Sequence, residues 1–223
     1  MDVPELWIMA GPNGAGKTTC VQKEPISSLL SYVKFYNPDD RTLMKLRSSG
    51  YQNFADSPAD LQARLFIEAA KDVAAELQDA LSQGLVIGVE TVMSTDKYLP
   101  IVESVRARGG IVGLIYVALS SSAISIERVT ARVLRGGHGV PPAKIVQRWH
   151  RSLDFLARFA GLANVFWVFD NSESTPGSSP RMIASGKDGI LEFLSPNVFP
   201  EMRAALAALP FSSEGNSLDK HNP

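Results

Sequence analysis

A short glycine-rich segment near the start of the chain has the residue types and spacing of a phosphate-binding loop. Gly11-Pro12-Asn13-Gly14-Ala15-Gly16-Lys17-Thr18 fits the pattern G-x-x-x-x-G-K-[ST] at every fixed position, and Thr19 follows it. In such a loop the glycines let backbone N–H groups converge on phosphate oxygens, and the next helix N-terminus adds positive charge. The lysine reaches the β- and γ-phosphates, and the threonine hydroxyl ligates Mg²⁺. An ordinary glycine turn is the alternative, but the pattern favours a nucleoside triphosphate site.

Acidic residues follow two of the predicted strands. Asp39 and Asp40 come after an apolar segment that ends at Tyr36, and Glu90 comes after another. Ligands of open parallel sheets bind outside the carboxyl ends of the strands, so these acids should face the same crevice as Lys17. A carboxylate there can orient a substrate hydroxyl or accept its proton. Two alternatives stay open: Asp39 and Asp40 could cap a helix, and Glu90 could be a solvated strand end.

Three arginines are spaced to share one face of a predicted helix. Arg128, Arg132 and Arg135 lie at i, i+4 and i+7, and a glycine-rich turn then leads to a second helix that carries Arg148. Arginines on a closing lid can stabilise the negative charge that phosphoryl transfer spreads over oxygen atoms. A solvated positive face is the alternative. His138, in the turn, has no metal-ligand spacing to another His or Cys, so we expect it to fix the turn or to contact a ligand.

Short apolar runs that alternate with helical patterns must position these residues. Apolar residues recur every four positions over residues 57–84, which predicts an amphipathic helix, and residues 100–108 and 122–160 are also helical, the latter broken at 136–142. Strands that alternate with helices imply right-handed crossovers. The predicted fold class is therefore α/β, a three-layer P-loop NTPase or kinase fold with a five-stranded, mostly parallel sheet. The predicted strands are 6–10, 32–36, 85–89, 111–119 and 165–169.

The last fifty residues have a different character. Residues 172–180 form a polar Ser/Pro/Gly linker, residues 181–185 and 190–194 flank a hairpin turn, and a helix is predicted over 200–209. We therefore expect a P-loop kinase domain over 1–172, with a helical arginine lid at about 122–160. A small C-terminal appendage over 173–210 should pack on this core, and 211–223 should be a flexible tail.

Composition narrows the possible functions. The chain has 223 residues, and 22 Lys+Arg against 23 Asp+Glu give a formal net charge of −1. A balanced charge gives no electrostatic reason to expect nucleic-acid or anionic-membrane binding. The longest apolar stretch, 111–119, is about half of the ~20 residues that a membrane helix needs, and the N-terminal residues do not resemble a signal peptide. A single cysteine, Cys20, suits a reducing compartment, so a cytoplasmic location is expected.

Taken together, the motifs resemble the zeta-toxin-like P-loop kinases of bacteria, over about residues 6 to 172. The lid string Gly-Gly-His-x-Val-Pro is distinctive of the short, chromosomally encoded branch of that family. The residues that carry the resemblance are Gly11 to Thr18, Asn37-Pro38-Asp39, Glu90-Thr91, Arg128-Val129, Arg132-Val133, Gly136-Gly137-His138, Val140-Pro141, Arg148 and Asp170-Asn171-Ser172.

The resemblance implies a five-stranded P-loop kinase core that phosphorylates a small-molecule hydroxyl with ATP and Mg²⁺. In characterised zeta toxins the acceptor is the amino sugar of UDP-N-acetylglucosamine, and a small antitoxin protein blocks the site. At the matching positions, Asp39 is the catalytic base and Glu90 is a substrate-binding acid, with Asp40 and Thr91 beside them. Where the family often has a second threonine after Glu-Thr, this chain has Val92.

The same resemblance and the lid spacing suggest how the arginines divide. Arg128 and Arg132 are favoured for ATP, and Arg135 or Arg148 for the transferred group, so Arg132 and Arg135 are the predicted catalytic arginines and Arg148 a substrate contact. A nucleotide-dependent binding module and a kinase that acts on nucleic-acid ends are the rival functions. ABC-type ATPases share the loop string, but here no strand ends in Asp-Glu.

Overall fold

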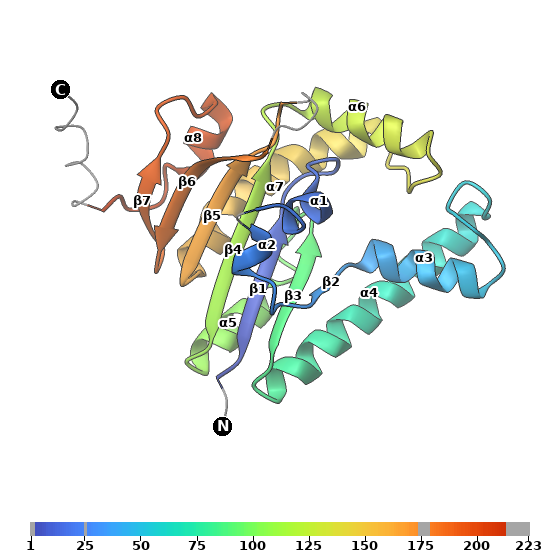
Figure 1. The fold of residues 1–223 in the computed structure, drawn as a ribbon, viewed down its shortest axis with the longest axis horizontal. Coiled ribbons are helices and arrows are strands. Elements are labelled where there is room, and N and C mark those ends of the chain that lie inside the picture. Colours follow the sequence, from blue (N-terminus) through green and yellow to red (C-terminus); the bar gives the residue numbers. More distant parts are fainter. Residues whose placement is uncertain (1–2, 25, 174–178, 213–223) are drawn as a thin grey trace.

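The chain folds around a seven-stranded mixed sheet, shown in Figure 1 as a computed structural model. The residues that the structure describes are 3–24, 26–173 and 179–212. The strands lie side by side in the order β2-β3-β1-β4-β5-β6-β7. Their bounds are β1 Glu5–Ala10, β2 Phe35–Tyr36, β3 Val86–Thr91, β4 Ile111–Ala118, β5 Val165–Asp170, β6 Arg181–Lys187 and β7 Ile190–Leu194.

Strands β1 to β5 run parallel to one another, which confirms the mostly parallel α/β sheet. β1 lies between β3 and β4, and its Ile8 is in register with Val89 and Leu114. Both faces of β1 are covered, because Leu6 to Ala10 are all buried. This explains why its sequence is a continuous apolar run. All five carboxyl ends meet at one edge, above which the phosphate-binding loop lies.

The sheet has seven strands and not the predicted five. The C-terminal hairpin was expected as part of an appendage packed on the core. In the structure β6 pairs antiparallel with β5 and so extends the sheet, and β7 pairs with β6. The tight turn is made by Asp188 at φ 45° and Gly189 at φ 75°. Local turn residues predict a hairpin, but they do not tell which strand it will join.

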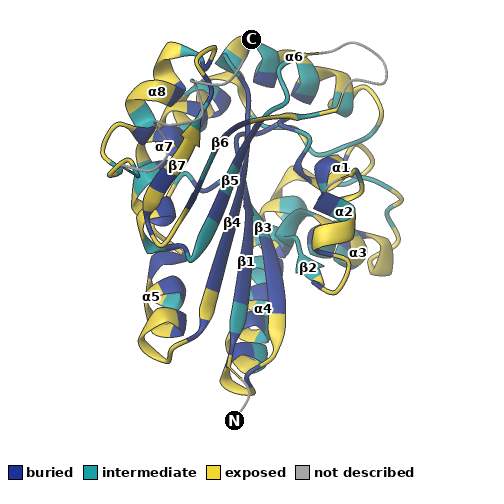
Figure 2. Cartoon of the chain, turned by 60° about the vertical axis from the view of Figure 1, so that its left-hand side comes forward, coloured by how far each residue is buried: buried dark blue, intermediate teal, exposed yellow. Residues whose placement is uncertain are grey.

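Helices cover the sheet on both faces, which gives three layers. α4, α5, α7 and α8 share a hydrophobic cluster with one face, and the short α1 and α2 share a second cluster with the other. Figure 2 shows the central strands almost entirely buried between these layers. The helix bounds are α1 Lys17–Val21, α2 Ile26–Leu29, α3 Pro38–Ser48, α4 Ala59–Ser82, α5 Leu99–Ala107, α6 Ser122–Val133, α7 Pro142–Leu162 and α8 Pro200–Leu206.

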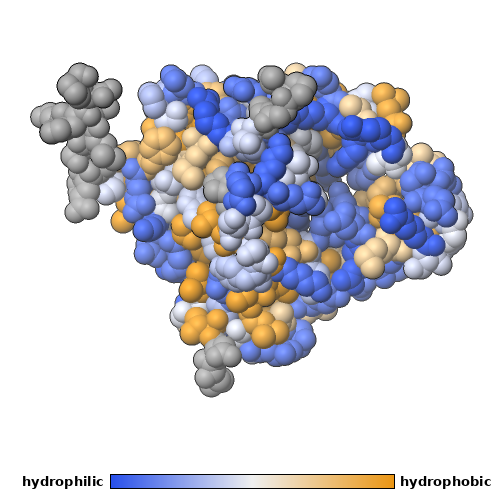
Figure 3. Space-filling model, in the orientation of Figure 1, coloured by the Kyte–Doolittle hydropathy of each residue, from blue (hydrophilic) through white to orange (hydrophobic). Residues whose placement is uncertain are grey.

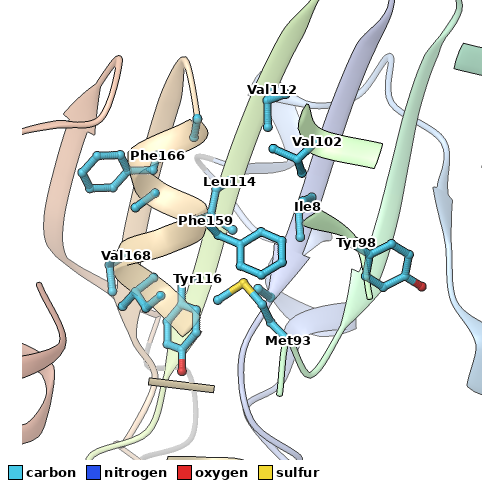
Figure 4. Packing of buried hydrophobic residues seen from close by; sticks show 14 of the residues in the cluster. Ile8, Met93, Tyr98, Val102, Val112, Leu114, Tyr116, Phe159, Phe166 and Val168 are labelled. Atoms are coloured by element: carbon cyan, nitrogen blue, oxygen red, sulfur yellow. The ribbon is translucent and has the colours of Figure 1, made fainter. Parts of the chain in front are cut away.

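The larger cluster fixes the long helices to the sheet. Figure 4 shows Phe159 of α7 lying between Ile8 and Leu114, with Met93 and Tyr116 close to it. A buried hydrogen bond of 2.8 Å joins the Tyr116 hydroxyl to Ser152 of α7. Because α7 is the second helix of the predicted lid, this packing holds one side of the lid rigidly over the sheet.

The helices α3 and α4 form a lobe that extends beyond the β2 edge of the sheet (Figure 1). Leu46, Phe54 and Leu65 make a small core of its own. Two ion pairs tie the helices together, Arg41 to Glu76 at 2.8 Å and Lys45 to Asp72 at 2.9 Å. The small core and the ion pairs therefore hold the two helices of the lobe together.

Residues after 172 share the sheet and the main core with the rest of the chain, through β6, β7 and α8. The boundary at residue 172 stays a prediction. Most of the predicted linker (174–178) and of the predicted tail (213–223) lies outside the described residues. Within the described part of the chain, no helix combines the length and the apolar character needed to cross a bilayer.

Candidate functional site

The phosphate-binding loop connects the end of β1 to the start of α1. Gly16 precedes the helix with a φ of 81°, and Gly14 has a φ of 73°, both in the left-handed region that favours glycine. The Lys17 ammonium lies beneath the loop and donates to the carbonyl oxygens of Gly11 at 3.0 Å and Pro12 at 3.1 Å. These two hydrogen bonds hold the Lys17 side chain against the curved backbone of the loop.

Close packing explains why the first glycine of the loop carries no side chain. A Cβ atom on Gly11 would lie 2.1 Å from the carbonyl oxygen of Val117, at the end of β4. On the other side, a Cβ on Gly14 would lie 3.1 Å from the Cβ of Arg128. The loop therefore fits between β4 and α6, and Asn171 holds it by donating from Nδ2 to the Ala15 carbonyl at 2.8 Å.

Lys17 lies in an unusual electrostatic setting. Burial lowers the pKa of its ammonium group, while the nearby carboxylates of Glu90 and Asp39 oppose that shift. A buried cation beside two acids is the kind of electrostatically perturbed group that marks a binding or catalytic site. The structure thus brings together the loop lysine and both predicted acids, although they are separated by up to 73 residues of sequence.

A cleft of about 290 Å³ opens between the loop, the lobe and the lid. Figure 3 shows the surface hollowed between the lobe, on the right, and the body of the molecule. Most of the side chains that line the cleft are polar, which suits a phosphorylated or hydroxylated ligand. The lining residues are Asn13, Gly14, Lys17, Asn37, Pro38, Asp39, Ala70, Glu90, Thr91, Val92, Met93, Ser94, Thr95, Lys97, Tyr98, Arg132 and Arg148.

The two neighbouring aspartates have different surroundings. Asp39 lines the cleft, whereas Asp40 is exposed and is not among the lining residues. The cap of α3 is the Asn37 side chain, which accepts from the Asp39 N–H at 2.9 Å. The capping alternative is therefore wrong for the Asp39 carboxylate, which the Asn-Pro turn directs to the cleft. The placement does not favour substrate contact for Asp40.

Thr18 and Glu90 lie against each other. The Thr18 hydroxyl donates to a Glu90 carboxylate oxygen at 2.9 Å, so Glu90 is not a solvated strand end. Burial raises the pKa of Glu90, and Lys17 and the Thr18 hydrogen bond oppose that shift. A hydroxyl and a carboxylate are the oxygen ligands that Mg²⁺ prefers, so this pair fits such an ion. Within the described residues no cluster of three or more His, Cys, Asp or Glu could hold a metal.

The other loop residues of the prediction do not all reach the cleft. Of the segment from Gly11 to Thr18, only Asn13, Gly14 and Lys17 line it. Thr19 is exposed on the first turn of α1. Thr91 lines the cleft, and its hydroxyl accepts from the Met93 N–H at 3.1 Å. Cys20 is buried, and burial raises the pKa of its thiol to about 11, which suits packing better than chemistry.

The predicted lid is the pair α6 and α7 with the turn between them. Arg132 reaches the cleft from α6, and its Nε and Nη2 atoms are buried without a hydrogen-bond partner among the described residues. Gly137 makes room for this side chain, since a Cβ there would lie 2.5 Å from the Arg132 Cγ. Two unpaired guanidinium nitrogens in a buried position are costly unless a ligand binds them.

The remaining lid arginines differ in placement. Arg148 lines the cleft from α7, and Arg128 donates to the backbone carbonyls of Ser172 and Glu173 at 3.4 and 3.1 Å. Arg135 is exposed and does not line the cleft. The prediction that it shares a helix face with Arg128 and Arg132 is wrong, because α6 ends at Val133. A catalytic role for Arg135 stays a prediction without support from its position.

His138 fastens the lid to the lobe. Its ring packs against both Phe54 and Phe66, with centroid distances of 5.1 and 4.4 Å. The neighbouring turn residue Gly136 lies close to Asn53, on the connection between α3 and α4. His138 thus fixes the turn, as one of the two expectations had it. We call this contact between His138, Phe54 and Phe66 the lid latch.

Replacing His138 with alanine should weaken lid closure and raise the KM for ATP roughly two- to tenfold, because aromatic pairs contribute about 0.5–1.5 kcal/mol each.

Burial lowers the pKa of His138, with Arg132 and Arg148 lowering it further and Asp39 opposing them. The closed lid therefore prefers the neutral ring, and KM should rise as the pH falls below ~6.5.

The control is His138→Phe, which keeps the ring packing but cannot titrate. Steady-state kinetics from pH ~7.5 to ~5.5 should show a smaller rise of KM in this variant than in the wild type. If both proteins respond equally to pH, or if His138→Ala has the wild-type KM, the latch does not control closure.

Sequence reasoning missed one wall of the cleft. The loop between β3 and α5 contributes Met93, Ser94, Thr95, Lys97 and Tyr98. It holds Met93 buried at a φ of 56°. A polar Ser-Thr-Asp-Lys-Tyr run after a buried strand could have indicated this wall, because such loops lie at the carboxyl edge of the sheet.

Comparisons with known proteins agree with this architecture. The native crystal structure of an AvrRxo1-ORF1:AvrRxo1-ORF2 complex superposes with a TM-score of 0.60 at 16% identity, covering 93% of this chain and 76% of that chain. The same complex with ATP gives 0.58 at 16%, covering 94% and 77%. The PezAT chromosomal toxin–antitoxin system of Streptococcus pneumoniae gives 0.51 at 14%, covering 78% and 70%. At these identities the likeness shows the fold.

The sequence itself gives the family. No curated protein matches the chain. A family model described as Zeta toxin matches residues 2–176, a span that includes the phosphate-binding loop, both acids and the lid. The chain therefore belongs to the zeta toxin family.

Proposed function

We propose that the protein is a kinase that transfers the γ-phosphoryl group of ATP to a hydroxyl group of a small molecule. The observation that carries the proposal is that Lys17, Asp39 and Arg132 line one cleft. Phosphoryl transfer needs a cation on the triphosphate, a carboxylate on the acceptor hydroxyl and positive charge on the transferred group. The zeta toxin family match and the fold neighbour that was solved with ATP support this function.

In the proposed reaction, the acceptor hydroxyl lies between Asp39 and the γ-phosphorus. Its oxygen forms a bond to phosphorus while the bond between phosphorus and the β–γ bridging oxygen breaks, which releases ADP. The hydroxyl proton passes to the Asp39 carboxylate. Because the Asn37 side chain caps α3, the Asp39 carboxylate is not needed as the helix cap. A positioned base of this kind contributes about 10²–10⁴-fold to the rate.

Cations from three directions would hold the phosphates. Lys17 meets the β- and γ-phosphates from below the loop, where it now donates to backbone carbonyls. Arg132 offers its two buried nitrogens to the transferred group, and Arg148 approaches from α7. Arg128 lies against the loop at Gly14 and donates to the Ser172 carbonyl. We assign it to ATP.

Mg²⁺ would be held by Thr18, with Glu90 beside it, and the rest of its ligands would come from the triphosphate and water. When bound, the ion neutralises phosphate charge. Glu90 is thereby assigned a place near the ion, in addition to the substrate contact that the family resemblance implies.

The acceptor is proposed to be a UDP-sugar such as UDP-N-acetylglucosamine, as the resemblance to characterised zeta toxins implies. Val92 lines the cleft where the family often has a threonine, so the acceptor loses one hydroxyl contact here. We further propose that the protein acts as the toxin of a toxin–antitoxin pair in the cytoplasm. The likeness to the PezAT system, named as a chromosomal toxin–antitoxin system, supports a small antitoxin protein as partner.

The experiment that tests the proposal is an acceptor screen. Purified protein is incubated with ATP, Mg²⁺ and a panel of UDP-sugars, nucleosides and 5′-hydroxyl oligonucleotides, and products are identified by mass spectrometry. We expect a product one phosphate heavier than one of the small molecules. ATP binding without any phosphorylated product would count against the kinase function, and labelled oligonucleotides would favour a nucleic-acid kinase.

The matched control for this screen is Lys17→Ala. Removing the ammonium should weaken ATP binding roughly 10- to 100-fold, the effect of losing hydrogen bonds to charged groups, and should abolish product formation. Isothermal titration with ATP measures the first effect. Unchanged ATP affinity in Lys17→Ala would show that the nucleotide binds elsewhere.

A further inference from the structure

The loop between β3 and α5 forms a wall of the cleft that the phosphate-binding loop, the acids and the lid do not account for. Ser94, Thr95, Lys97 and Tyr98 all line the cleft from this loop. We propose that Lys97 binds an anionic group of the acceptor and so selects acceptors that carry a phosphate or diphosphate. The inference rests on the kinase function proposed above.

The order of the strands places Lys97 on the acceptor side of the cleft. Arg128, which is assigned to ATP, and Asn171, which holds the phosphate-binding loop, follow β4 and β5, on one side of β1. Lys97 follows β3, on the opposite side of β1, next to the β2 edge where Asp39 lies. A ligand of Lys97 therefore lies on the same side of β1 as Asp39 and away from Arg128 and Asn171.

The charge of Lys97 is available for a ligand. Among the ion pairs and side-chain hydrogen bonds of the described residues, none involves the Lys97 ammonium. Lys97 is exposed at the rim of the cleft, and partial burial lowers the pKa of its ammonium group. Its nitrogen lies 5.0 Å from the centre of the Tyr98 ring, which keeps the side chain against the wall. An anion at this point would supply the missing partner.

The backbone that carries Lys97 is held in place from both ends. The Ser152 hydroxyl of α7 donates to the Val92 carbonyl at 2.8 Å, and the Leu99 N–H donates to the Asp96 carbonyl at 2.8 Å. The Tyr98 side chain is 4% exposed, and Figure 4 shows its ring beside the core with the hydroxyl pointing away from the cluster. A rigid support of this kind suits a side chain that determines specificity.

The other groups in the cleft leave few alternatives for an anion of the acceptor. Asp39 and Glu90 repel it from the place where the hydroxyl reacts. Lys17, Arg132 and Arg148 are the cleft cations that the proposed reaction assigns to the phosphates of ATP. Lys97 is the cation that remains on the acceptor wall, with the hydroxyls of Ser94 and Thr95 next to it as neutral donors. An acceptor with a sugar-like hydroxyl at one end and a phosphate at the other could place the hydroxyl at Asp39 and the phosphate at Lys97.

The test measures ligand binding to protein that is already loaded with Mg²⁺ and a non-hydrolysable ATP analogue. UDP and uridine serve as probes, with and without the anionic group, and isothermal titration gives their Kd values. We expect Lys97→Gln to weaken UDP binding about 10- to 100-fold and to leave uridine and the ATP analogue unaffected. Lys97→Arg should keep most of the UDP affinity, and Lys187→Gln, an exposed lysine on β6, is the matched control.

Wild-type UDP affinity in Lys97→Gln, equal affinity of the wild type for UDP and uridine, or no binding of either probe to the loaded wild type would each overturn the inference. The kinase function is judged separately by the acceptor screen. A Lys97-dependent UDP site in a protein that phosphorylates nothing would contradict the kinase function and support the anion site.

Discussion

Replacing Arg132 with alanine is expected to lower kcat for phosphoryl transfer by about 10³–10⁵-fold, the range found for arginines that stabilise a transferred phosphoryl group. The reason lies in the two buried guanidinium nitrogens, which have no partner within the described residues and lie in the same cleft as Lys17. Their interaction with the equatorial oxygens strengthens as charge develops, so it accelerates the chemical step more than it strengthens ATP binding.

Rapid-quench or steady-state measurement of phosphorylated product tests this effect. Arg158→Ala is the control, because Arg158 is an exposed arginine on α7 that does not line the cleft. A loss of less than tenfold in Arg132→Ala, with Arg158→Ala at the wild-type rate, would show that Arg132 does not stabilise the transferred group.

The second large effect is expected for Asp39→Asn, which should lower kcat by about 10²–10⁴-fold and leave ATP affinity nearly unchanged. Asparagine keeps the size and shape of the side chain but cannot accept the acceptor's proton. Because Asn37 and not Asp39 caps α3, the substitution should not destabilise the helix, and thermal unfolding can check this.

The matched control is Asp60→Asn, since Asp60 is an exposed acid in the first turn of α4. Product formation and ATP titration are measured for all three proteins. Full activity in Asp39→Asn would remove the base assignment, whereas loss of ATP binding would show that Asp39 acts on the nucleotide.

The phosphate-binding loop and its neighbours could be predicted from sequence because each signal is local. The string from Gly11 to Thr18 carries its own turn and helix start, and the apolar runs around it identify β1 and β3. Asp39 was placed in the crevice by a general rule about the carboxyl ends of parallel strands. These parts depend on short segments, whose local preferences agree with the fold.

Other parts depend on contacts between distant segments and could not be predicted in this way. The pairing of β6 with β5 joins strands across the linker, and local turn residues do not specify it. The position of Arg135 was predicted wrongly because α6 ends at Val133, two residues before Arg135, although the i, i+4, i+7 spacing of the arginines suggests a longer helix. The lid latch and the Lys97 wall bring together residues from α4, the lid and the β3–α5 loop, so only the folded chain shows them.

The most direct measurement of the central claim is the stoichiometry of ADP formation. The amount of ADP released from ATP is compared with the phosphate recovered on the acceptor and as free phosphate, with and without the acceptor identified by the screen. The account predicts acceptor-dependent ADP formation, with one phosphate on the acceptor for each ADP. ADP formation that is indifferent to acceptor and balanced by free phosphate would contradict it and would favour a nucleotide-dependent switch.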